Sequence, residues 1–236
     1  MKKLLLVLTS FVSLVASAQT AEEIIDKFAK AHGGLDAFTK IATAKITGNL
    51  IVQGESYPLT VQLVNGKAMR SEATVMGQTI VTAYKDGKAW TINPLAGSTT
   101  PTDVEGDMLQ DFRAQSNLAS MLMDYKKYNM KVESLGSETV DGIATHKIKL
   151  TPADSPRSTT YYISSKDYTL VKATATREMM GQTFDTETYY SNLKDFSGLK
   201  FYMTRDMKIQ GQTFQQIEFT NIELNAPVDE KIFIKP

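Results

Sequence analysis

The feature that most constrains this chain is a six-residue pattern that occurs four times. The pattern is an apolar residue, a spacer, Gly, then Gln or Glu, then Thr or Ser, and a second apolar residue, at 52–57, 75–80, 179–184 and 209–214. Each copy is flanked by segments in which apolar and polar residues alternate, as in half-buried strands. The repeats therefore predict tight hairpins between long antiparallel strands.

Glycine at the first position of a two-residue loop suits a type II′ turn, because that position needs a positive φ angle. This choice puts Gly54-Glu55 in the first loop and Leu50 opposite Leu59. Directly opposed residues share a face of the sheet, so the pairing predicts one apolar face on each hairpin.

The same choice for the last hairpin puts Gly211-Gln212 in the loop. A loop at Gln210-Gly211 would place Ile209 opposite Gln212, which is a poorer match. We therefore expect a meander of long strands that has one apolar side and must bury it.

The first eighteen residues predict export. Lys2 and Lys3 precede an apolar run over 4–15, and the sequence Ala-Ser-Ala over 16–18 resembles a signal-peptide cleavage site. The run is too short for a membrane-spanning helix. We expect a signal peptide over 1–18, cleaved after Ala18, and one periplasmic domain over 19–236.

Composition excludes several classes of function. The chain has no cysteine, which excludes disulfides, thiol nucleophiles and a lipid-anchored cysteine. Without Lys2 and Lys3 it has 24 basic and 26 acidic residues, so it lacks the basic field of a nucleic-acid-binding protein. We expect no nucleic-acid partner and a monomer.

Two helices are predicted beside eleven or twelve strands. The first begins with a capping box over 20–23, buries Ile24 and Phe28, and ends at Gly33-Gly34. The second follows a helical pattern over 103–128. A long twisted sheet curls, and we expect the helices to fill part of its concave apolar face.

Catalytic signals are weak. Of the two histidines, His32 is placed at a helix end and His146 on the apolar face, where a hydrogen-bonded core histidine is the simplest interpretation. No nucleophile-elbow, zinc-protease or phosphate-loop motif is present. We expect no catalytic residues, no metal, no cofactor and no enzymatic activity.

Methionine and arginine suggest binding instead. Several of the eleven methionines fall at predicted inward positions, either as ordinary gap filling or as an adaptable apolar surface. Arg177 and Arg205 interrupt the apolar face, and the predicted register puts Arg205 opposite Glu218. The three residues form either a salt bridge near a sheet end or a polar spot that holds a head group or latches a helical lid.

Several of these segments resemble the LolA-like family of periplasmic carriers, in particular the outer-membrane lipoprotein-sorting branch. Residues 86–94, DGKAWTINP, are similar to the family stretch D-G-K-x-x-W-x-x-N-P, with one residue fewer before Trp90. The first helix with its Gly-Gly end, the Gly-Gln-Thr hairpins and the ending over 229–236 are also similar. The resemblance covers most of residues 20–236.

The resemblance implies a mainly β fold, an unclosed antiparallel β-barrel with an α-helical lid over an apolar cavity. It implies a periplasmic carrier or chaperone that binds lipoprotein acyl chains, or another lipid-like ligand, and exchanges them with membrane-bound donor and acceptor proteins. The family has a basic residue and Pro-Asn before the D-G-K turn, and the basic residue helps to close the lid. This chain has Leu-Val-Asn-Gly at 63–66 instead.

Thirteen apolar residues are predicted to line the cavity, and four of them, from 108 to 122, belong to its movable helical part. They are Leu50, Val52, Leu59, Val61, Met69, Trp90, Met108, Phe112, Met121, Leu122, Phe201, Met203 and Phe214.

Two alternatives to a carrier remain at this stage. A sensor or adaptor could use the same fold to bind lipoprotein or protein partners and regulate envelope signalling. An exported hydrolase would need a polar catalytic cluster at one rim, which the sequence does not show.

Overall fold

The computed structural model describes residues 19–153, 157–179 and 182–236. The expected signal peptide and its cleavage site lie outside the described residues. The helices are α1 (Ala21–Ala31), α2 (Leu35–Thr39), α3 (Gly106–Gln115) and the short 3-10 helices η1 (Pro94–Ala96) and η2 (Glu230–Phe233).

Strands dominate the chain. They are β1 (Thr43–Val52), β2 (Glu55–Val64), β3 (Ala68–Val75), β4 (Gln78–Lys85), β5 (Lys88–Asn93), β6 (Ser98–Val104), β7 (Met130–Val140), β8 (Ile143–Pro152), β9 (Thr159–Ser164), β10 (Leu170–Met179), β11 (Gln182–Phe196), β12 (Leu199–Ile209) and β13 (Gln212–Leu224).

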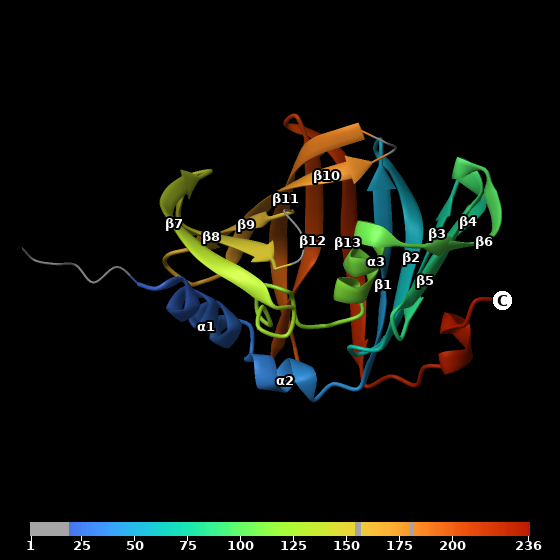
Figure 1. Ribbon diagram of the computed structural model, residues 1–236, viewed down its shortest axis with the longest axis horizontal. Helices are drawn as coiled ribbons and strands as arrows, with labels where there is room; N and C mark the ends of the chain where they lie inside the picture. The colour runs from blue at the N-terminus through green and yellow to red at the C-terminus, as the bar shows by residue number, and fades with distance from the viewer. Residues whose placement is uncertain (1–18, 154–156, 180–181) are drawn as a thin grey trace, which may run out of the picture.

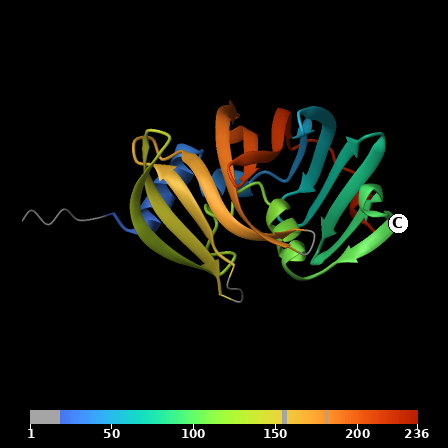
Figure 2. The same cartoon turned by 90° about the horizontal axis from the view of Figure 1, so that it is seen from above.

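All thirteen strands form one antiparallel sheet in the order β6-β5-β4-β3-β2-β1-β13-β12-β11-β10-β9-β8-β7. Each strand pairs with its neighbours in sequence, except at the joint where β1 pairs with β13. The outer strands β6 and β7 do not meet, so the sheet is an unclosed barrel. Figure 2 shows it bent into an arch, with α3 between the two arms.

The predicted turn type is wrong. In the first hairpin Val52 pairs with Glu55, and the loop is Gln53-Gly54, both with positive φ (53° and 82°). Two positive φ values define a type I′ turn, whose twist matches that of the strands. Leu50 therefore faces Tyr57, two residues from the predicted partner, and because side chains alternate with period two, the predicted apolar face is unchanged.

The last hairpin departs further from the prediction. Its loop is Gln210-Gly211, and Ile209 does pair with Gln212. A β-bulge between Met207 and Lys208 then shifts the register by one residue for the rest of the hairpin. Turn geometry outweighed the single apolar match, because the exposed hairpin tip gains little from pairing two apolar side chains.

The helix predicted over 103–128 is also shorter than expected. Residues 98–104 form the edge strand β6, α3 ends at Gln115, and 117–129 form a series of turns. Just beyond α3, Ser116 Oγ and Asn117 Nδ2 both donate to the Arg113 carbonyl, at 2.7 and 3.0 Å. Side chains of this kind compete with the backbone bonds that would continue a helix.

The first helix agrees with the sequence. Thr20 Oγ1 accepts from Glu23 N, and Glu23 Oε2 accepts from Thr20 N, which completes the capping box. Ile24, Ile25 and Phe28 are buried in the largest core cluster, against β8–β10.

The convex face of the sheet is polar and aromatic. Lys147, Tyr162, Lys172 and Tyr189 lie in one row across β8–β11. Lys172 Nζ lies 4.9 and 5.6 Å from the ring centroids of Tyr162 and Tyr189 and 2.6 Å from Glu187. The lysine ammonium groups lie over the tyrosine rings and pair with Glu138 and Glu187, so the charges of this row are matched within the structure.

His32 is buried rather than exposed at the helix end. Its Nδ1 lies 2.7 Å from the Phe28 carbonyl, so this nitrogen carries the proton, and Nε2 accepts from the Tyr202 hydroxyl at 2.9 Å. The same hydroxyl accepts from Leu170 N–H. Burial lowers the pKa of His32, against an opposing contribution from the Phe28 carbonyl.

This network predicts a pH-dependent stability. A histidine whose folded pKa is lowered stabilises the fold above its unfolded pKa, and that stabilisation is lost as pH falls through about 6.5 and below. We expect the free energy of unfolding, measured by urea titration, to fall between pH 7.5 and 5.5. The decline should be much smaller in His32→Gln.

His146 supplies the control. Burial, and then Lys27, also lower its pKa, but its ring is only half-buried and stacks on Tyr168. His146→Gln should keep most of the decline. A decline unchanged in His32→Gln would contradict the assignment.

Candidate functional site: the concave face

The topology places a covering segment over the concave face. The chain leaves the sheet at one outer edge, β6, and re-enters it at the other, β7. The connection over 105–129 must therefore cross the open side of the arch, and it carries α3 (Figures 1 and 2). Strand order thus explains why a segment covers this face, as the predicted helical lid would, although only Gly106–Gln115 of that segment is helical.

One end of the concave face is closed by α3. Phe112 packs on two buried clusters, one formed by Ala44, Leu63 and Met69 and the other by Tyr84, Ala89 and Val104. Leu109 joins the second cluster. Because Phe112 is only half-buried itself, α3 lies on the face without being enclosed by it.

The rest of the connection is fixed more firmly. Leu122 is fully buried and packs in the core cluster that also holds α1 and β8–β10. Asn65, at the β2–β3 turn, donates from Nδ2 to the Phe38 and Ile41 carbonyls, both at 2.9 Å, and its Oδ1 accepts from Leu118 N at 3.0 Å. An Asn-Gly pair predicts only a turn, so sequence reasoning could not find this bridge.

Beyond α3, toward the hairpin tips, the concave face is open and apolar. Six half-buried side chains surround the buried Leu59, Ala73 and Val75, and we call these six the apolar patch. They are Leu50, Tyr57, Val61, Ile80, Ile217 and Phe219.

The strand register puts the patch on the same face as α3. Ile217 and Tyr57 both pair with Leu50, and Leu50 lies two, four and six residues along β1 from Gly48, Ile46 and Ala44. Side chains two residues apart on a strand point the same way. The patch is therefore a continuation of the surface that α3 covers.

The structure distributes the predicted cavity residues among several environments. Leu50, Val52, Leu59, Val61, Met69 and Met203 fall on concave-face positions, and Phe201 packs in the clusters beside them. Met69 and Met203 are fully buried, as Leu122 is, whereas Met121 is half-buried. Met108 and Phe214 are 53% and 48% exposed.

Trp90 does not lie with the others. It pairs with Ala83, which pairs with Arg70, and this row faces the convex side, opposite Tyr84 and Ala89. The C-terminal η2 covers it: Trp90 Nε1 donates to the Phe233 carbonyl at 3.1 Å (Figure 1 shows η2 outside the arch). The concave position predicted for Trp90 is wrong, because alternation alone does not show that a terminal segment covers the other face.

The predicted pairing of Arg205 with Glu218 is also wrong. The bulge, whose extra residue is Phe214 of β13, places Arg205 opposite Ile217 and Glu218 opposite Thr204, so the two charges lie on opposite faces. Glu218 accepts from Gln216 on the convex side. Arg177 and Arg205 share the concave face, since Arg177 is in register with Phe184 and Arg205 with Tyr190.

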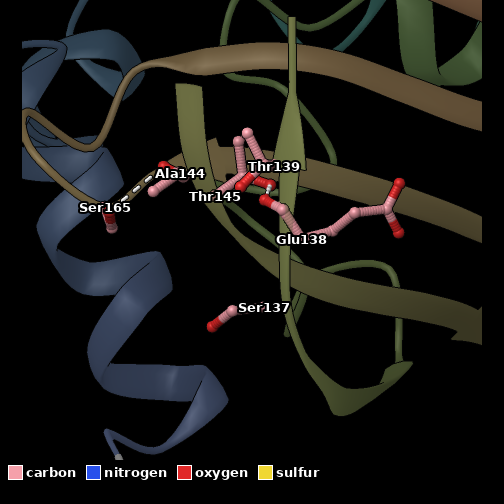
Figure 3. Close-up of a pocket in the computed structure, with 6 residues that line it drawn as sticks. All are labelled: Ser137, Glu138, Thr139, Ala144, Thr145 and Ser165. Atoms are coloured by element: carbon pink, nitrogen blue, oxygen red, sulfur yellow. Dashed lines mark hydrogen bonds between the residues drawn. The ribbon is translucent and has the colours of Figure 1, made fainter. Parts of the chain in front are cut away.

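Two pockets among the described residues, both lined mainly by polar residues, lie away from the apolar patch. One, of about 430 Å³, is lined by residues of β9–β11 such as Thr174, Asp185 and Glu187. The other, of about 230 Å³, lies at the β7–β8 hairpin (Figure 3). There Thr145 and Ser165 donate their hydroxyl protons to the carbonyls of Glu138 and Ala144.

Within the part of the chain that the structure describes, no group of acidic or histidine side chains is arranged to hold a metal ion. No helix of the described residues is long and apolar enough to span a bilayer.

Neither a protein-family model nor a curated protein sequence matches this chain. Solved structures do. A LolA superfamily protein from Nitrosomonas europaea aligns at 14% identity and a TM-score of 0.60, over 92% of this chain and 99% of that one. This is a LolA-like fold.

Two further structures agree with this assignment. A Vibrio parahaemolyticus protein, described as an outer-membrane lipoprotein-sorting protein domain, aligns at 12% identity and a TM-score of 0.58, over 89% of this chain and 94% of that one. A DUF1329 family protein from Desulfovibrio piger aligns at 12% identity and a TM-score of 0.60, over 92% and 98%. At these identities the likeness extends to the fold alone.

In this LolA-like fold, α3 is tied to the opposite arm by charge. Arg157, which precedes β9, lies 2.6 Å from Asp107 and 4.0 Å from Asp111, both on α3. The pair therefore bridges the mouth of the arch.

We expect Asp107→Asn to loosen α3 without unfolding the sheet. The Asp107 side chain is more than half exposed, so the pair contributes at most about 1 kcal/mol. Amide hydrogen exchange of α3 should accelerate by about two- to fivefold, and 1 M salt should reproduce the effect in the wild type. Asp103→Asn is the control. Asp103 lies on the edge strand β6 and makes a similar contact with Lys235, so its substitution should leave the hydrogen exchange of α3 unchanged.

Proposed function

We propose that the protein is an exported carrier that binds acyl chains of lipoproteins, or another lipid-like ligand, on its concave face. In this role it exchanges ligand between membrane-bound donor and acceptor proteins in the periplasm and takes it toward the outer membrane. The proposal is of binding and release, without catalysis.

The apolar patch is the observation that carries this proposal. It places six half-buried apolar side chains together on one face of the sheet, next to α3, which rests on that face through the half-buried Phe112. Contiguous apolar surface of this kind is typical of a binding site for apolar ligands or partners. The opposite face carries lysines and carboxylates, so the two faces differ sharply in what they can bind.

An open patch also suits release. Each buried methylene contributes about 0.8 kcal/mol, so complete enclosure of several acyl chains would bring binding close to irreversible. A chain that lies along the patch stays partly in contact with water, and one that extends under α3 has to displace Phe112 from its two clusters. Both effects lower the net affinity to a value from which cargo can be transferred.

The fold gives independent support. The Vibrio parahaemolyticus protein of the same fold is described as a lipoprotein-sorting domain, which agrees with an apolar ligand carried between membranes. Residues 1–18, with their charged start and small-residue end, supply the route to the periplasm.

Neighbouring residues on β1 provide a direct test. Leu50 points into the patch, whereas Ile51 points to the convex face, and both are half-buried. Leu50→Glu should weaken binding of the neutral dye N-phenylnaphthylamine and of a dipalmitoylated lipopeptide by about tenfold or more, because a charge is placed under the ligand. Ile51→Glu should bind both like the wild type.

Thermal unfolding of the two variants separates binding from folding. Each adds one carboxylate to the same half-buried strand, so similar midpoints with different affinities support the carrier. Equal losses of affinity, or dye binding that neither variant changes, would contradict a ligand site on the concave face.

A further inference from the structure

Two cations face the ligand side of the sheet. Arg177 on β10 and Arg205 on β12 lie on either side of β11, where Tyr190 pairs directly with Arg205. The Arg205 guanidinium carbon lies 5.3 Å from the ring centroid of Phe219, which belongs to the apolar patch. Arg205 therefore borders the patch, and Arg177 lies on the same concave face beside Phe184, six residues along β11 from Tyr190.

Neither arginine is neutralised within the structure. Among the described residues, no carboxylate lies within ion-pair distance of Arg177 or Arg205, in contrast to Arg70, which lies 2.6 Å from Glu72. Nearby carboxylates point away, because Asp185, Glu187 and Asp206 alternate with the concave positions of β11 and β12. The stacking on Phe219 favours the cation but leaves guanidinium N–H donors free.

The polar groups around the two cations are neutral donors. Tyr161 and Tyr190 share this face, and no described group hydrogen-bonds to the Tyr190 hydroxyl. Burial raises the pKa of both tyrosines, against an opposing effect of Arg177 on each and of Arg205 on Tyr190. The phenols therefore remain protonated, and the field of both arginines reaches the Tyr190 hydroxyl.

We propose that Arg177, Arg205 and the Tyr190 hydroxyl bind the anionic head group of an amphiphile whose acyl chain lies on the apolar patch. The head group is a carboxylate or a phosphate, both of which match the fork of guanidinium donors. The inference rests on the proposed carrier function and adds to it a class of ligand, an acyl chain with a negative charge at one end.

Three ligands of equal chain length test it: tetradecanoate, tetradecyl phosphate and tetradecanol, each measured by displacement of N-phenylnaphthylamine. The wild type should bind at least one anion about tenfold more tightly than the alcohol, as expected for charge-assisted hydrogen bonds. Arg177→Gln and Arg205→Gln should each reduce that preference several-fold and leave the affinity for tetradecanol unchanged. Arg113→Gln, which removes an exposed arginine of α3, is the matched control and should change neither.

The outcomes separate this inference from the carrier itself. Equal wild-type affinity for the anions and the alcohol would overturn the head-group site and leave the carrier standing. Failure to bind all three ligands would overturn the carrier. Displacement of tetradecyl phosphate by inorganic phosphate at similar concentration would identify a site for free anions and overturn the proposal of an amphiphilic ligand. A preference for one of the two anionic ligands over the other supports the inference and identifies the head group.

Discussion

The pairing of β1 with β13 is the constraint on which the rest of the structure depends. Every other strand pair joins neighbours in sequence, whereas this one joins two meanders whose strands lie about 170 residues apart. The approach is close: a Cβ atom at Gly48 would lie 2.3 Å from the Glu218 carbonyl oxygen, beside the bulge in this pair. Once the joint forms, β6 and β7 become the outer edges, and the segment between them has to cross the concave face.

The two faces of the sheet then take different roles. The convex face is covered by lysine–tyrosine contacts in one arm and by η2 over Trp90 in the other. On the concave face α1, α2, α3 and the turns that follow α3 cover the core clusters and leave the apolar patch half-buried. The few helices of this fold leave part of the apolar side of the sheet half-buried, and the ligand site proposed above lies on that part.

The sequence predicted the structure correctly where the periodicity of apolar residues alone determines the element and its buried face. Alternation identified the strands, the apolar face and the helix α1, and the apolar face survived a wrong turn because the error in register was two residues. Prediction failed where a β-bulge or a contact between distant segments determines the position of a side chain. The bulge at Phe214 separated Arg205 from Glu218, and Trp90 lies on the convex face, where η2 covers it. The Asn65 bridge was missed because its three partners come from two distant segments.

We propose that the concave face holds an acylated ligand in the cell. Native mass spectrometry of the protein purified from the periplasm of the cells that produce it, followed by lipid extraction, tests this proposal. We expect a stoichiometric adduct that releases a lipid or an acylated peptide. Protein that is empty, and that also fails to take up lipid or a neutral apolar dye, would contradict it.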